Sequence, residues 1–185
     1  MIGQPETLMV AQVDGAAVTA AAATSLLHAS SKRTLPANIF NYIGQTLRVV
    51  ARGRISSVIT TPGTARFDLR LGGALAFDGL AILLDTVAGH TNVGWKLVMD
   101  LTVRAIGTTG NFMGSGEWTC EDILGVPATA PKGVLTAILP WNSVPAVGAA
   151  VDMTTSLQAD LFFTQTVATG SCTLHQFELS LPNGY

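Results

Sequence analysis

Three histidines, two cysteines and twelve carboxylates are the residues of this 185-residue chain that could perform acid–base, nucleophilic or metal chemistry. No His-x-His or His-x-x-x-His pair provides the nucleus of a metal site, and Gly114-Ser115-Gly116 lacks the frame of a nucleophile elbow. Neighbouring residues of a strand point to opposite faces, so the adjacent Glu121 and Asp122 would not form a catalytic carboxylate pair. They are expected in a solvated turn at a strand end. The sequence therefore predicts no enzyme, no cofactor and no metal site.

The cysteines and two of the histidines fit structural roles. Cys120 and Cys172 are too few for a disulfide framework, and Met1–Val10 carries no lysine or arginine that would mark a secretory leader. Both cysteines are expected as buried thiols, and a bond between them stays open if the fold brings them together. His175 alternates with apolar residues and is expected to be buried and hydrogen-bonded. His28 lies beside a polar loop and is expected to be structural.

Composition indicates a protein that covers part of its surface with other subunits. Charged residues make up 12% of the chain, against roughly 25% in an average soluble protein, and the mean hydropathy is +0.43. No run of about 18 uninterrupted apolar residues is present to cross a membrane, and the net charge of −2 argues against direct nucleic-acid binding. Self-association into a homo-oligomer is the expectation that remains.

The elements that would position surface chemistry centre on residues 45–71. Residues 47–57 alternate between apolar or small side chains and arginines, and residues 66–71 alternate again after a break at Thr60–Gly63. A period of two predicts strands with one buried and one exposed face. We expect a solvated outer face whose charge repulsion is offset by cross-strand partners such as Asp68; the functional alternative is a basic face that meets an acidic patch on a partner protein. Its arginines are Arg48, Arg52, Arg54, Arg66 and Arg70.

Similar patterns along the rest of the chain predict an all-β, jelly-roll-like antiparallel β-sandwich of about eight strands. A helical turn is expected at Leu35–Gly44, capped by Asn38, with Ile39, Phe40 and Ile43 plugging one end of the sandwich. The remaining strands are expected at 77–84, 93–106, 112–121 and 134–139, and as a closing hairpin of 157–167 with 172–181. The expected core anchors are Phe67, Trp95, Trp118 and Phe177.

Residues 1–23 are expected to form an arm, and residues 24–185 the sandwich domain. The arm lacks clean alternation and carries only Glu6 and Asp14 as charges. Strand addition to a neighbouring subunit or a shell is the expected mode, with Leu8, Val10 and Val13 as contacts. A first strand of the protein's own sandwich is the alternative.

Six short segments are informative as a set rather than singly. They are Leu35–Arg48, Gly53–Ser56, Thr60–Thr64, Thr91–Trp95, Arg104–Gly107 and Leu174–Gln176. Together they resemble small virion structural proteins of tailed bacteriophages, over residues 24–181. The resemblance implies a jelly-roll-like module displayed on the particle, usually as a trimer, and it brings no catalytic residues.

The functional expectation is a non-enzymatic virion protein, assembled in the host cytoplasm. Its first form is a capsid decoration (cement) protein that binds the head shell as a homotrimer, with the major capsid protein as partner. A tail or fibre component is the alternative in the same class. A carbohydrate-binding module is the alternative from another class, because jelly rolls host lectins. Trp141-Asn142 is the candidate sugar contact for that module, and a hydrolase is the weakest option.

Overall fold

The computed structural model of the protein describes residues 4–124 and 134–184. These residues form twelve strands and one short 3-10 helix, η1 (Ala29–Ser31), and none of them forms an α-helix or any helix able to cross a membrane. The strands are β1 (Glu6–Val10), β2 (Thr24–Ser25), β3 (Thr34–Leu35), β4 (Thr46–Ser57), β5 (Thr64–Leu71), β6 (Ala74–Asp78), β7 (Ile82–Leu83), β8 (His90–Ala105), β9 (Asn111–Leu124), β10 (Val134–Leu139), β11 (Leu157–Gln165) and β12 (Ser171–Leu181).

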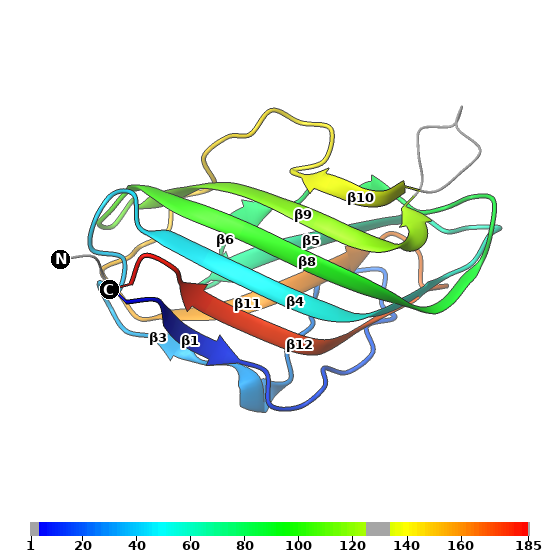
Figure 1. Ribbon diagram of the computed structural model, residues 1–185, viewed down its shortest axis with the longest axis horizontal. Coiled ribbons are helices and arrows are strands. Elements are labelled where there is room, and N and C mark those ends of the chain that lie inside the picture. Colours follow the sequence, from blue (N-terminus) through cyan, green and yellow to red (C-terminus); the bar gives the residue numbers. More distant parts are fainter. Residues whose placement is uncertain (1–3, 125–133, 185) are drawn as a thin grey trace.

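Two antiparallel six-stranded sheets pack face to face (Figure 1). The front sheet has the order β1-β12-β4-β8-β9-β10. The back sheet has the order β2-β11-β5-β6, with β3 paired to β11 and β7 paired to β5. The expected all-β sandwich is confirmed. Four more strands appear than the eight expected. β2, β3 and β7 have two residues each, too few to show a period, and β1 lies in the segment expected to be an arm.

Several connections cross between the sheets and wrap the sandwich in a jelly-roll-like manner, and two of them are short links between long strands. Residues 58–63 join β4 in front to β5 behind, and residues 166–170 join β11 behind to β12 in front. Because β4 pairs with β12 and β5 pairs with β11, both crossings lie at the same end. The expected hairpin of residues 157–167 with 172–181 is therefore wrong, since these two strands belong to opposite sheets.

An aromatic cluster joins the two sheets. The ring of Phe67, in the back sheet, lies 5.0 Å from Trp95, 4.9 Å from Trp118 and 5.2 Å from Phe163 between ring centroids. All four expected core anchors, Phe177 included, are buried. Gly114 in β9 shows how closely the layers approach, because a Cβ there would overlap the ring of Phe77.

Two local predictions fail where backbone conformation overrides side-chain pattern. Residues 36–44 form turns rather than a helical turn, and Asn38 and Gly44 adopt positive φ of 59° and 95°. Ile39 and Phe40 are buried as expected, but Ile43 is exposed. The expected strand at 77–84 is broken in two, because the chain turns at Leu80, where φ is 59°.

The first residues of the chain lie along the edge of the front sheet. β1 pairs with β12. The chain after β1 stays on the same edge: the Ala11 N–H donates to the Phe177 carbonyl, and Val18 and Cys172 exchange two backbone hydrogen bonds. Met9 and Val18 are buried. Strand addition therefore takes place on the protein's own sheet, the alternative given above. Of the expected arm contacts, Leu8 is half-buried, and Val10 and Val13 are exposed.

Candidate functional site

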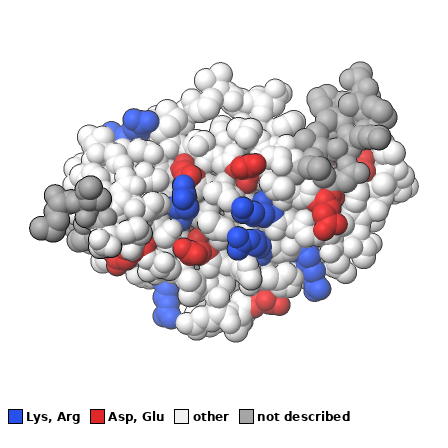
Figure 2. All heavy atoms as spheres, viewed as in Figure 1, with Lys and Arg blue, Asp and Glu red and all other residues white. Residues whose placement is uncertain are grey.

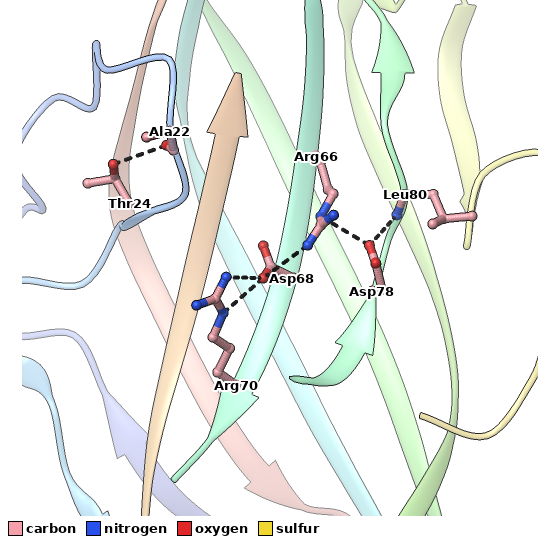
Figure 3. Close-up of polar contacts among 7 residues, drawn as sticks. All are labelled: Ala22, Thr24, Arg66, Asp68, Arg70, Asp78 and Leu80. Atoms are coloured by element: carbon pink, nitrogen blue, oxygen red, sulfur yellow. Dashed lines mark hydrogen bonds and ion pairs between the residues drawn. The ribbon is translucent and has the colours of Figure 1, made fainter. Parts of the chain in front are cut away.

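The outer face of the back sheet carries a continuous row of ion pairs. The buried Asp68 carboxylate lies 3.0 Å from Arg70 and 3.6 Å from Arg66, and Arg66 lies 3.1 Å from Asp78 (Figure 3). The Arg70 guanidinium also lies 4.0 Å from the centroid of the Phe162 ring. Each arginine thus has its opposite charge inside the molecule, so this face offers little free positive charge to a partner.

The five arginines expected to share one basic face do not do so. β4 carries Arg48, Arg52 and Arg54 in the front sheet, whereas β5 carries Arg66 and Arg70 in the back sheet. The period of two fixes which side of a strand a residue occupies, but it does not say which sheet the strand joins. Alternation alone therefore does not separate the two groups; the jelly-roll topology does, because it places these two strands in opposite sheets.

Arg48 is neutralised on the front sheet. Its Nε and Nη2 donate to the two carboxylate oxygens of Asp100 at 2.7 and 3.0 Å, in a bidentate pair across β4 and β8. These hydrogen bonds, together with the attraction of the charges, raise the pKa of Arg48 above its usual range. Both side chains are well exposed, so the pair stabilises the fold by about 1 kcal/mol at most.

Arg52, Arg54 and Lys96 form an unpaired group in the middle of the front face, called here the central cations. Arg52 lies directly opposite Lys96 in the pairing of β4 with β8, and Arg54 is two residues along β4. Arg52 donates to the Gln176 amide oxygen at 3.1 Å. None of the three has an ion pair with a residue that the structure describes. Figure 2 shows blue and red side chains interspersed across this face.

A shallow, open hollow of about 470 Å³ lies beside the central cations. Gly94, opposite Arg54, leaves space where another residue would place a side chain. Thr119 and Glu121 of β9 line the far side of the hollow. Sequence reasoning overlooked Lys96 and Gly94, because their place beside Arg52 and Arg54 depends on the register between β4 and β8.

The candidate sugar contact, Trp141-Asn142, lies in the loop after β10 and beside an open hollow. Trp141 is half-buried against the core, and its backbone N–H donates to the Gly79 carbonyl at 2.9 Å. Asn142 occupies a turn with φ of 48°. Around them, residues 134–151 contain no charged side chain.

The histidines have local partners. The expectation that His175 is buried is wrong. His175 lies at a β-bulge in β12, where the alternation of buried and exposed side chains is interrupted. Its half-exposed ring lies 3.0 Å from the Asp14 carboxylate. His28 caps η1 by accepting from the Ser30 N–H.

His90 contacts Asp85 at 2.9 Å in a largely buried pair. Burial raises the pKa of Asp85, but hydrogen bonds from His90 and from the Val87 and Ala88 N–H groups outweigh it, so the pKa is lowered overall.

The described residues hold no group of three histidine, cysteine or acidic side chains placed to bind a metal ion. Cys120 and Cys172 are both buried thiols, as expected. Burial raises the pKa of the Cys172 thiol well above its usual range, so this cysteine is a packed apolar side chain at neutral pH. The Glu121 backbone lies within β9 rather than in a turn.

The fold and these surfaces define a class, an all-β sandwich module with charged sheet faces. No family model matches the chain, and no curated protein matches it. Among solved structures, the chain is similar to the CBM2 module of the evolved Dit of Lactobacillus casei BL23 phage J-1. The two share 11% sequence identity and a TM-score of 0.34 over 83% of this chain and 69% of that chain. A TM-score this low carries no argument about function.

Proposed function

We propose that the protein is a non-enzymatic structural component of a bacteriophage virion, a decoration protein that adds to the capsid as a homotrimer. The resemblance of segments such as Leu35–Arg48 and Thr91–Trp95 to small virion proteins supports the virion. The structural observation that carries the decoration role is a core completed within one chain, with buried residues from both sheets. A subunit with its own core can fold alone before it adds to a finished shell, whereas a domain-swapped assembly exchanges elements between its subunits.

Self-association is proposed through the uncharged surface, defined as residues 136–151. β10 is an edge strand of the front sheet, so one side of its backbone lacks a strand partner within the described residues. Ile138 and Val144 are exposed at 67% and 83%, beside an open hollow of about 760 Å³ that they line with Pro140 and Trp141. Depletion of charge is typical of the centre of a subunit interface.

Replacing Ile138 with lysine is expected to dissociate the trimer, because a charge would be buried without a partner at the interface. Light scattering at micromolar concentration should give a trimer for the wild type and a monomer for I138K. Ile43→Lys is the matched control, because Ile43 is exposed at 63% and is not among the residues that define the uncharged surface. I43K should remain a trimer, and a wild-type protein that is monomeric would disprove the self-association.

Binding to the particle is tested with separated heads and tails of the phage that lack this protein. Purified tagged protein is mixed with each fraction and sedimented. Co-sedimentation with heads, saturating at a fixed ratio to the major capsid protein, is the expected result. Binding to tails alone would replace the decoration role by the tail alternative. Binding to neither fraction would contradict a virion role altogether.

A further inference from the structure

The central cations hold a like-charge pair that nothing on the described surface neutralises by direct contact. Arg52 and Lys96 face each other across two paired strands, and Arg54 adds a third positive charge on the same face. Like charges placed directly opposite each other destabilise a sheet. Arg48 on the same strand differs from them, because its charge is neutralised by a bidentate pair with Asp100.

Carboxylates lie around the central cations, but none of those that the structure describes forms an ion pair with them. Glu178 of β12 and Glu117 of β9 lie in the neighbouring cross-strand row, opposite Val50 and Val98 respectively. Glu121 lies at the hollow, with an oxygen 3.6 Å from where a Cβ on Gly94 would stand. The arrangement is a small positive centre bordered by negative side chains, with an empty floor at Gly94.

We propose that this hollow binds a carboxylate-bearing sugar unit of an extended acidic polysaccharide. Arg52 and Lys96 donate to the sugar carboxylate, with Arg54 reinforcing the positive field. Thr119 and Glu121 bind the adjacent ring hydroxyls, because a hydroxyl can donate to a carboxylate. An open, shallow hollow suits a chain that passes over the sheet rather than an enclosed small molecule.

The bordering glutamates favour a sugar over an acidic protein surface. An acidic protein patch would bring several carboxylates against Glu117, Glu121 and Glu178, and like charges repel. A uronate unit carries one negative charge and surrounds it with hydroxyl groups. Such a unit places its charge at the central cations and its hydrogen-bond donors at the glutamates.

The test is affinity electrophoresis through gels containing polygalacturonate, with dextran and polyglutamate gels as the neutral and the peptide polyanion. The wild-type protein should be retarded by polygalacturonate and much less by the other two. Lys96→Gln should weaken the binding about tenfold or more, because a charge-assisted hydrogen bond is lost. Gly94→Val should abolish retardation by filling the hollow, and its φ is not in the left-handed region.

Arg104→Gln is the matched control, because Arg104 is an exposed cation on the same strand as Lys96 and its loss changes the net charge equally. R104Q should bind polygalacturonate within about twofold of the wild type, and melting curves should show all variants folded. The proposal is overturned if the wild type is not retarded by polygalacturonate, if polyglutamate retards it equally, or if R104Q weakens binding as much as K96Q. None of these outcomes bears on the proposed self-association, which uses the uncharged surface, or on the sedimentation of the protein with heads or tails.

Discussion

Replacing Trp118 with alanine should lower the free energy of unfolding by about 3–5 kcal/mol. The Trp118 side chain has no exposed surface, and its ring packs edge-on against Phe67 of the opposite sheet. Truncation would leave a cavity between the two layers, which a tightly packed core cannot close completely. A typical domain is stable by only about 5–15 kcal/mol, so the loss should be visible as a much lower urea midpoint.

Tyr42→Ala is the matched control for this measurement. Tyr42 is exposed at 39% in the turns that precede β4. Its truncation should cost less than half as much as that of Trp118, because less apolar surface returns to water. A loss below about 1 kcal/mol for Trp118→Ala, measured by urea unfolding, would show that this ring does not join the sheets.

Alternation in the sequence predicted the long strands and their inward faces. Trp95 in β8 and Trp118 in β9 fall in phase with their apolar neighbours, and both are buried. The signal is strong because each strand is exposed on one face only, so the period of two persists for ten residues or more. Surface charges follow the same phase, which is why Arg48, Arg52 and Arg54 were correctly placed on one outer face.

Long-range pairing was beyond what a local pattern can predict. Residues 157–181 have the appearance of a hairpin, yet β11 pairs with β5 and β12 pairs with β4. A linker of five or six residues can turn back within one sheet or cross to the other, and the alternation is the same in both cases. The β-bulge that exposes His175 could not be predicted either. A bulge is an extra residue in one strand relative to its partner, so it is defined only by the register of β12 against β4.

The candidate site was also predictable only in part: local alternation indicated its arginines, and long-range pairing decides which of them are neutralised. Composition and alternation identified arginines on an outer face, but their state depends on partners far away in the chain. Asp100 neutralises Arg48, whereas Lys96 adds to the charge of Arg52. Only the register of β4 against β8 distinguishes the paired arginine from the unpaired ones. The glycine that opens the hollow, Gly94, becomes meaningful only once Arg54 is known to lie opposite.

Deleting residues 1–23 is expected to destabilise the sandwich by about 3–6 kcal/mol. The segment contributes two buried side chains, Met9 and Val18, and each buried side chain of this size is worth about 1.5–3 kcal/mol. It also covers the edge of β12, where Ala11 and Gly15 donate to the carbonyls of Phe177 and Leu174. This expectation opposes that of an anchoring arm bound to a neighbouring subunit or a shell, whose loss would leave the unfolding midpoint nearly unchanged.

Thermal unfolding of the truncated protein decides between a strand of the sandwich and a separable arm. Deletion of residues 1–5, which precede β1, is the control and should leave the midpoint within a few degrees of the wild type. Met9→Ala provides an intermediate step and should cost about 2–5 kcal/mol if β1 stays on β12 in solution. A protein lacking residues 1–23 that melts with the wild-type midpoint would show that the segment is an arm. One that fails to fold would show that the edge of β12 needs its cover, because an uncovered edge strand leaves a row of unpaired N–H and C=O groups.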